Sequence, residues 1–275
     1  MQYHSTRDKS ISVSSAEAIK TGLSAEGGLF VPESFPSVSL DEIKNLASKS
    51  YNERAYFVLS KFLSDFTEEE LKKCIDSAYT KEKFETESIA PVYKLNDTTY
   101  FLELWHGPTC AFKDMALQIL PHLLTTSMKK TNEDKEIVIL VATSGDTGKA
   151  ALEGFKDVAG TRIIVFYPDN GVSEIQKLQM VTQEGNNVSV AAVKGNFDDA
   201  QSGVKKIFTD VDYKNLLDRN QFKLSSANSI NWGRLVPQIV YYFSSYAELV
   251  KNNEIEIGDK INVVVPTGNF GNILA

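Results

Sequence analysis

A lysine near the start of an expected helix is the residue of this chain best suited to covalent chemistry. Lys113 comes soon after His106-Gly107-Pro108, which ends an extended apolar run over residues 100–104. Apolar residues then recur at helical spacing, at Phe112, Met115, Ala116, Ile119 and Leu120. The positive end of a helix and the loss of solvent both disfavour an ammonium ion, so we expect the pKa of Lys113 to lie below its ordinary value of about 10.4. Such an amine can form a Schiff base with an aldehyde; an ordinary solvated lysine in a first helical turn is the alternative.

Two other stretches have the order strand, glycine-rich loop, helix start. In the first, residues 137–142 are followed by Thr143-Ser144-Gly145-Asp146-Thr147-Gly148. In the second, residues 261–265 are followed by Pro266-Thr267-Gly268-Asn269-Phe270-Gly271-Asn272. Loops of this kind direct unpaired backbone N–H groups at an anion. Together with Lys113, they suggest pyridoxal phosphate as cofactor and an anionic amino acid as substrate.

Taken together, these stretches resemble threonine synthase, one of the pyridoxal-phosphate enzymes of fold type II. Residues 106–114 resemble that family's cofactor-lysine motif, residues 142–148 its substrate loop, and residues 265–272 its phosphate cup. The N-terminal run from Ser5-Thr6-Arg7 through residues 26–32 is also similar, and it favours threonine synthase over the related dehydratases and cysteine synthases. The resemblance covers essentially the whole chain.

The resemblance implies a fold and a division into domains. The expected fold is α/β, similar to the tryptophan synthase beta chain, with a parallel three-layer α/β sheet preceded by an α-rich N-terminal domain. Residues 1–95 would be that domain, and residues 96–136 the cofactor-lysine segment of the larger domain. Residues 137–258 would form the smaller α/β domain, and residues 259–275 the truncated start of the larger one.

The resemblance also assigns roles to residues. Lys113 would be the catalytic residue and would hold the cofactor, whose phosphate would lie on Gly268, Asn269, Phe270, Gly271 and Asn272. The substrate carboxylate would lie on Thr143, Ser144, Gly145, Asp146 and Thr147, and the substrate phosphate near Asn228, Ser229, Asn231 and Arg234. Short polar residues before a helix are also ordinary caps, so that alternative stays open for residues 228–231. The role of Asp146 is open too, because related enzymes place an Asn there beside the cofactor's ring oxygen, which an acid would repel.

The implied reaction is the conversion of O-phospho-L-homoserine and water to L-threonine and phosphate, a lyase step of threonine biosynthesis. Lys113, once released by the substrate, would act as the general base at the substrate α-carbon. The alternatives are a serine or threonine dehydratase and a non-catalytic fragment that binds pyridoxal phosphate or another anion. The family's chains continue beyond Ala275, so we expect this chain by itself to bind cofactor weakly and to turn over little substrate.

Composition excludes several other classes of protein. The chain has 275 residues, 42% hydrophobic and 24% charged, as is typical of a globular protein with a large core. A net charge of -7 without a basic stripe argues against nucleic acid as a partner. Three scattered histidines, with Cys74 and Cys110, give no metal-type spacing. Because we find no signal peptide and no long apolar run, we expect no membrane partner and a cytoplasmic location.

The remaining sequence predicts helices first and then an alternation of strands and helices. Capping patterns at Ser14, Ser39 and Thr67 predict three early helices, the first of them ending at Gly22. Strands are expected at 162–167, 188–193 and 222–224, with helices between them. A strong helical stripe follows over residues 232–250, where Pro237 should kink the helix or mark its start. This alternation predicts a parallel sheet whose ligands bind at the carboxyl ends of the strands.

Overall fold

The N-terminal part of the chain is built from short helices whose starts are fixed by hydroxyl caps. The computed structural model describes residues 1–268 and 270–275, so the expectation for Asn269 lies outside the described residues. The helices are α1 (Ser15–Thr21), α2 (Leu40–Leu46), α3 (Tyr51–Phe62) and α4 (Glu68–Ala78). Their N-caps are Ser14, Ser39, Ser50 and Thr67, and the last three form complete capping boxes. A small antiparallel sheet beside α1 contains β1 (Tyr3–Ser5), β2 (Ser12–Val13) and β3 (Phe30–Pro32).

The segment around Lys113 lies between a hairpin and two consecutive helices. The hairpin pairs β4 (Val92–Lys94) with β5 (Tyr100–Leu102) in antiparallel fashion. The expected helix is divided into α5 (Asp114–Leu117) and α6 (Leu120–Lys130). Pro121 explains the division, because it has no N–H to donate to the carbonyl of Leu117. Gly154 packs closely against that carbonyl, and any side chain there would collide with it.

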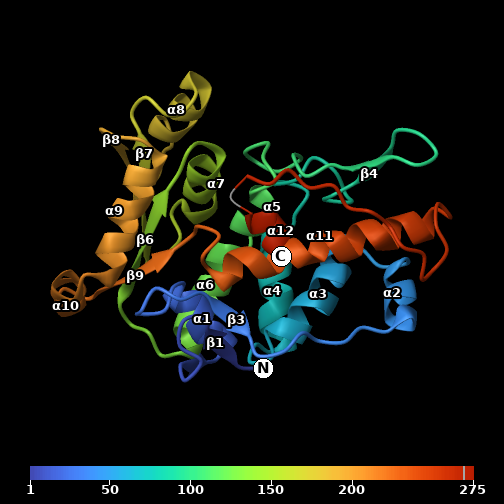
Figure 1. Cartoon of the computed structure of the whole chain (residues 1–275), viewed down its shortest axis with the longest axis horizontal. Helices are drawn as coiled ribbons and strands as arrows, with labels where there is room; N and C mark the ends of the chain where they lie inside the picture. The colour runs from blue at the N-terminus through green and yellow to red at the C-terminus, as the bar shows by residue number, and fades with distance from the viewer. Residues whose placement is uncertain (269) are drawn as a thin grey trace.

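The second half contains a four-stranded parallel sheet, as the alternation of strands and helices predicts. Its strands are β6 (Glu136–Ala142), β7 (Thr161–Pro168), β8 (Val188–Val193) and β9 (Phe222–Ser226), in the order β8-β7-β6-β9. The connecting helices are α7 (Asp146–Phe155), α8 (Glu174–Val181), α9 (Phe197–Thr209) and α10 (Val211–Arg219). Figure 1 shows α7 and α9 on opposite faces of the sheet, which gives three layers.

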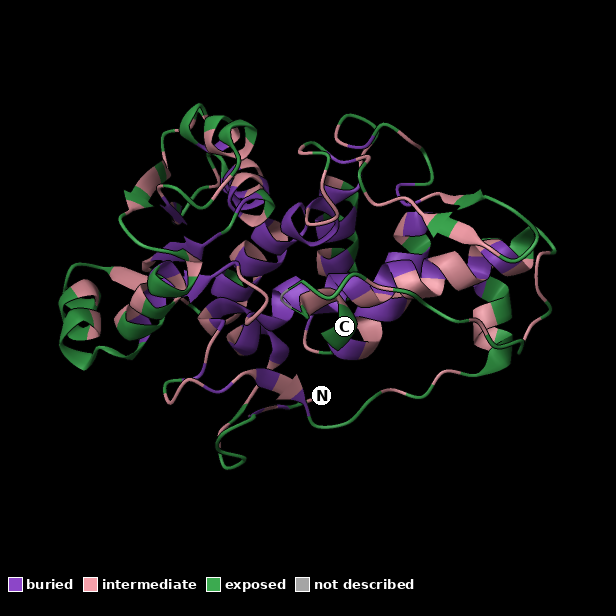
Figure 2. Cartoon of the chain, turned by 45° about the horizontal axis from the view of Figure 1, so that its top comes forward, coloured by how far each residue is buried: buried purple, intermediate pink, exposed green. Residues whose placement is uncertain are grey.

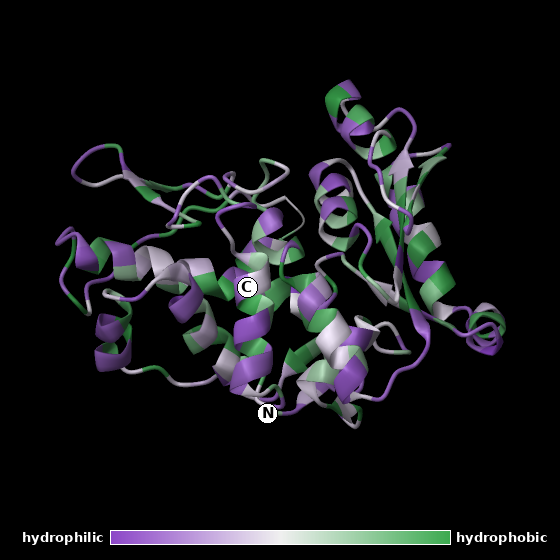
Figure 3. Ribbon diagram, turned by 180° about the vertical axis from the view of Figure 1, so that it is seen from behind, coloured by the Kyte–Doolittle hydropathy of each residue, from purple (hydrophilic) through white to green (hydrophobic). Residues whose placement is uncertain are grey.

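Alternation along β6 explains the layers. Ile137, Ile139 and Val141 join the larger hydrophobic core, which also contains the inner face of α7. Val138, Leu140 and Ala142 point the other way and pack with residues of α9. Figure 3 shows the resulting hydrophobic strands between helices that carry both hydrophobic and hydrophilic residues.

The long helix α11 (Trp232–Lys251) crosses the middle of the molecule and belongs to the larger core (Figure 1). It packs mainly against α3, α5 and α2, although it follows β9 in the chain. Pro237 lies inside the helix, and the helix continues on both sides of it. Buried residues gather where the helical part meets the sheet (Figure 2). Because α11 packs against α5, the element that follows Lys113 is held on α11.

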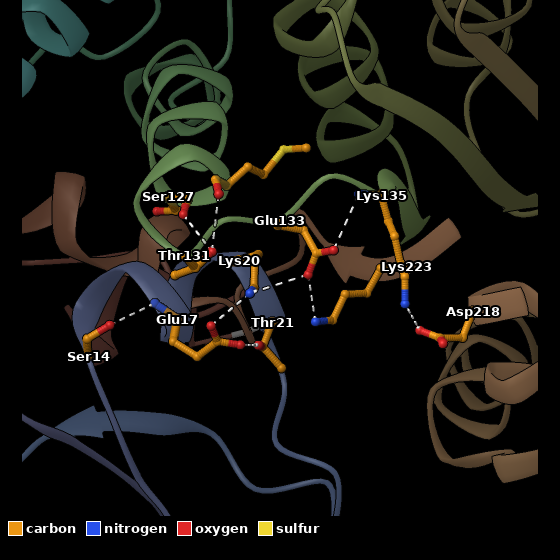
Figure 4. Close-up of polar contacts among 11 residues, drawn as sticks. Ser14, Glu17, Lys20, Thr21, Ser127, Thr131, Glu133, Lys135, Asp218 and Lys223 are labelled. Carbon is orange, nitrogen blue, oxygen red and sulfur yellow. Dashed lines mark hydrogen bonds and ion pairs between the residues drawn. The ribbon is translucent and has the colours of Figure 1, made fainter. Parts of the chain in front are cut away.

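A chain of charged side chains connects α1 to the sheet (Figure 4). The Nζ atom of Lys20, which is 4% exposed, lies 2.8 Å from a carboxylate oxygen of Glu17 and 3.4 Å from one of Glu133. Glu133, in the link between α6 and β6, also pairs with Lys223 of β9 at 2.8 Å. Lys135 continues the row by pairing with Asp218 of α10.

One expected strand is absent. Residues 261–265 form no strand, and Val263 and Val264 are 56% and 94% exposed. The prediction of a strand there was wrong because β propensity needs a neighbouring strand to pair the backbone, and none lies beside this segment in the described residues. The short helix α12 (Gly271–Leu274) follows. Among the described residues, no helix is long and apolar enough to span a bilayer.

Candidate active site

Lys113 is the N-cap residue of α5 and is half-buried. Its Nζ atom lies over the ring of Phe112, 4.7 Å from the ring centroid. Burial lowers the pKa of Lys113, the positive charge of Arg234 lowers it further, and the carboxylate of Asp146 acts in the opposite direction. The expected low pKa is therefore confirmed in direction, but burial and Arg234 are its causes; a helix as short as α5 contributes little dipole.

The loop before Lys113 is held by the residue that follows it. Asp114 is fully buried, and its two carboxylate oxygens accept hydrogen bonds from the backbone N–H and the hydroxyl of Thr109, both at 2.8 Å. Gly107 gives the room for this contact, since a Cβ there would lie 2.6 Å from the Cβ of Asp114. Burial raises the pKa of the Asp114 carboxyl, while the bonds from Thr109 lower it. These contacts fix the backbone from which Lys113 projects.

His106 takes part in the same turn. Its Nε2 atom lies 2.8 Å from a carboxylate oxygen of Glu103, and its backbone carbonyl accepts a hydrogen bond from the N–H of Glu85. The side chain is thus engaged with acidic neighbours in the turn that precedes Lys113.

The first glycine loop follows β6 at its carboxyl end. The hydroxyl of Thr143 accepts hydrogen bonds from the N–H groups of Gly145 and Gly148, both at 3.0 Å, and donates to the carbonyl of Gly145 at 2.9 Å. Thr143 therefore shapes the loop from inside and has no hydroxyl group free for a ligand. Ser144 and Asp146 are exposed and Thr147 is half-buried, so these three keep accessible side chains for one.

A residue outside the sequence-based set covers this loop. Gln176 of α8 lies against Gly145 and donates a hydrogen bond from Nε2 to Oδ1 of Asp146 at 2.7 Å. The pattern Ser173-x-x-Gln176 predicts a helix start, but nothing in the sequence predicts this contact across 30 positions.

The polar segment before α11 is mostly occupied by internal contacts. Asn228 bonds both ways with the backbone of Ala142, and so joins the end of β9 to the end of β6. Asn231 caps α11, and its amide contacts the N–H of Gly233 and the carbonyls of Ile19 and Ser226. The cap interpretation thus describes Asn231, which has no polar atom free for a substrate. Ser229 differs, because it lies directly against Gly271, where a Cβ would come within 2.5 Å of its hydroxyl.

Arg234, which the sequence places near the substrate phosphate, is a buried cation at the start of α11. Its side chain is 2% exposed, and its Nε and Nη1 atoms have no hydrogen-bond partner among the residues that the structure describes. Burial lowers the pKa of Arg234 to about 10, although the charge of Asp114 and the hydroxyl of Tyr241 raise it. A buried cation with free N–H groups is costly unless an anion binds it. The donors of Arg234 therefore fit the anionic ligand that the two loops suggest.

The second glycine-rich loop lies beside Ser229 and α11. Gly268 and Phe270 are exposed and have positive φ angles of 44° and 59°. Asn272 is anchored on α11, because its Oδ1 accepts hydrogen bonds from the hydroxyls of Tyr241 and Tyr242 at 2.6 and 2.5 Å. Sequence reasoning found neither tyrosine, since both lie in a helical stripe that also predicts simple burial.

The site is therefore assembled from four separate segments of the chain. Lys113 and Arg234 interact electrostatically, Asp146 acts on Lys113 from the first loop, and Gly271 of the second loop contacts Ser229. An amine, a buried cation and two loops are parts that a phosphorylated aldehyde cofactor and an anionic substrate require.

Comparison with known proteins agrees with this geometry. Residues 84–275 match the family described as pyridoxal-phosphate dependent enzyme, and residues 2–79 match the one described as threonine synthase N terminus. Human threonine synthase-like 1 is 43% identical over 269 residues, and threonine synthase of Pseudomonas aeruginosa is 39% identical over 276. These alignments cover 94% and 100% of this chain but 36% and 56% of the relatives.

A solved structure shows the same fold. The pyridoxal-phosphate-bound threonine synthase of Brucella melitensis superimposes with a TM-score of 0.86 at 35% identity, covering 100% of this chain and 56% of that one. The chain belongs to the family of pyridoxal-phosphate dependent enzymes, whose fold is type II. Within that family it corresponds to the N-terminal portion of the threonine synthases.

Proposed function

We propose that this protein takes part in the threonine synthase reaction, in which O-phospho-L-homoserine and water give L-threonine and phosphate. The observation that carries the proposal is the buried Arg234, whose Nε and Nη1 have no partner and whose charge acts on Lys113. A substrate with both a carboxylate and a phosphate needs two anion sites beside the amine. The chain spans 36% to 56% of the curated relatives named above, so the activity of the whole protein is part of the proposal.

In this proposal, the phosphate of the cofactor lies on Gly268, Phe270, Gly271 and Asn272; the sequence-based set also names Asn269, which lies outside the described residues. When bound, pyridoxal phosphate supplies the electron sink that makes the substrate α-carbon acidic. Lys113 holds the cofactor and afterwards takes and returns the α-proton, for which a lowered pKa is suited because more of the amine is neutral near pH 7.

The remaining residues orient the substrate. Ser144 and Thr147 offer hydroxyls, and the first turn of α7 offers backbone N–H groups, to its carboxylate. Arg234 binds the phosphate of the substrate. Ser229 lies at the edge of the cup that holds the phosphate of the cofactor. Thr143, Asn228 and Asn231 act indirectly, by shaping the first loop, joining the ends of two strands and capping α11.

The domain division also belongs to this proposal. Residues 1–95 and 137–258 are taken as units beside the larger domain, to which residues 96–136 and 259–275 contribute. The sequence-based boundary at residue 258 includes α11 in the sheet unit, but the packing of α11 against α3 and α5 favours an earlier end, before α11.

Reduction with borohydride in the presence of pyridoxal phosphate tests the proposal. Peptide mapping should find the label on Lys113, and Lys113→Ala should lose it. Labelling of Lys149 or Lys177 instead would overturn the assignment. With O-phospho-L-homoserine, phosphate and threonine should appear in equal amounts; a 2-oxo acid released from serine or threonine would identify a dehydratase.

A further inference from the structure

Helix α8 contacts the first glycine loop through the side chain of Gln176. The amide of Gln176 lies so close to Gly145 that a Cβ there would come within 2.6 Å of its Cδ. Gly145 is buried for this reason, while Ser144 and Asp146 on either side are exposed. From this position Nε2 of Gln176 donates to Oδ1 of Asp146 at 2.7 Å.

The orientation of the Gln176 amide is set from its own helix. Its Oε1 accepts hydrogen bonds from the N–H and the hydroxyl of Ser173, at 3.3 and 3.2 Å, which leaves Nε2 directed at Asp146. One turn later, Met180 packs against Gly148, where a Cβ would lie 2.5 Å from the sulfur. Helix α8 is thereby held on the loop at two points, and it lies next to α7 in Figure 1.

Asp146 matters because its charge acts on Lys113. Two charged groups act on Lys113 from neighbouring helices, Arg234 from α11 and Asp146 from α7, with opposite effects. Asp114, which follows Lys113 in the chain, has both carboxylate oxygens bonded to Thr109. The side chain of Asp146 is exposed, so without a partner it would turn freely in water, where its charge is screened.

We propose that Gln176 is a positioning residue, whose amide holds the carboxylate of Asp146 where its charge reaches Lys113. Gln176 touches neither cofactor nor substrate in this assignment and acts only through Asp146. The inference deepens the proposed function, since it rests on the role given there to Lys113. It also gives Asp146 a role, as the counter-charge that offsets part of the effect of Arg234.

Competitive acetylation with acetic anhydride, followed by mass spectrometry, measures the titration of Lys113 without any cofactor. Gln176→Leu removes the donor and keeps the charge of Asp146, whereas Asp146→Asn removes the charge and keeps an oxygen that can accept from Gln176. Because Asp146 raises the pKa of Lys113, both substitutions should shift the titration midpoint of Lys113 to lower pH. The double variant should titrate like Asp146→Asn alone.

A matched control lies on the same helix. Gln179→Leu makes the same change at a side chain with no hydrogen bond in the described part of the chain, and it should leave the midpoint where it is in the wild type. Thermal unfolding confirms that each variant is folded, and Gln176→Asn, too short to reach Asp146, replaces Gln176→Leu if that variant does not fold. An unshifted midpoint in Gln176→Leu overturns the proposal, and so does a further shift when it is added to Asp146→Asn. Since no cofactor is used, these results stand apart from the borohydride test of the proposed function.

Discussion

The hydroxyl of Tyr241 donates a hydrogen bond to the side-chain oxygen of Asn272 at 2.6 Å. Tyr241 is buried in the middle of α11, and Asn272 lies 31 positions later in α12, directly after the second glycine-rich loop. Tyr242 donates to the same oxygen at 2.5 Å. Because both hydroxyls face that oxygen, they fix the direction of the Asn272 amide and tie the proposed phosphate cup to the core of the molecule.

The double variant Tyr241→Phe, Tyr242→Phe should weaken the binding of pyridoxal phosphate. Each hydroxyl contributes about 1 kcal/mol when it bonds a fixed partner, so we expect the dissociation constant to rise by roughly five- to thirtyfold. An absorbance titration with the cofactor measures the change.

Tyr246→Phe is the matched control for these tyrosines. Tyr246 lies on the same helix, but its hydroxyl donates to the carbonyl of Asp259, away from the cup. This variant should bind the cofactor as the wild type does. Equal weakening in Tyr246→Phe and in the double variant would show that loss of any tyrosine hydroxyl from α11 disturbs binding. That result would contradict the role given to Asn272.

Local sequence predicts the parts of this site that depend on local structure. Lys113 at a helix start and the loop after β6 follow from glycine, proline and the spacing of apolar residues. The parallel sheet follows from the alternation of strands and helices. The strand at 261–265 did not form, since a strand depends on a neighbour that composition does not specify.

Contacts between distant segments lie beyond such reasoning. Gln176 and Tyr242 each reach a loop about 30 residues away, and a helical stripe or a capping pattern predicts neither contact. Polar side chains near a turn are ambiguous for a related reason. Thr143 and Asn231 have the residue types of ligand contacts, but backbone groups of the chain itself satisfy them.

Lys113 should react with amine reagents at lower pH than Lys177. Burial and the charge of Arg234 lower the pKa of Lys113, whereas the hydrogen bond to Asp169 raises that of Lys177. An amine reacts in its neutral form, which becomes the main form as pH rises through the pKa. Acetylation followed from pH 7 to 11 should therefore modify Lys113 first. Simultaneous modification of the two would contradict the inferred environment of Lys113.

Arg234→Met should abolish binding at the proposed substrate-phosphate site without destabilising the fold. The substitution removes a buried cation that has no partner for its Nε and Nη1 and leaves an apolar side chain of similar length. We expect the free energy of unfolding to stay the same or to rise by on the order of 1 kcal/mol. Calorimetry with O-phospho-L-homoserine should show binding in the wild type and none in the variant.

Arg54→Met is the comparison for that experiment. Arg54 is equally buried, but its Nη1 pairs with Glu248 at 2.7 Å and its Nε donates to the carbonyl of Leu46. Removing it breaks the pair with the half-buried Glu248 and leaves the carbonyl of Leu46 without this donor, which costs about 1–3 kcal/mol. A loss of this size in Arg234→Met as well would mean that Arg234 is paired inside the protein and is not an anion site.

Glu133→Gln should destabilise the connection between α1 and the sheet in a pH-dependent way. Burial by itself would raise the pKa of the Glu133 carboxyl, but the hydrogen bond and charge of Lys223, with the charge of Lys20, hold it below 4.5. A carboxyl whose pKa is lower in the folded state stabilises that state above the unfolded pKa and loses this effect as pH falls through the folded value. We expect urea denaturation to show a free energy of unfolding that is lower than in the wild type by on the order of 2 kcal/mol at pH 7, a difference that shrinks as pH falls below 4.5.

Glu136→Gln is the control. It breaks the more exposed pair with Arg162 and should cost less than about 1 kcal/mol at pH 7. A deficit in Glu133→Gln that is the same at pH 7 and pH 3 would show that its charge does not hold the two parts together.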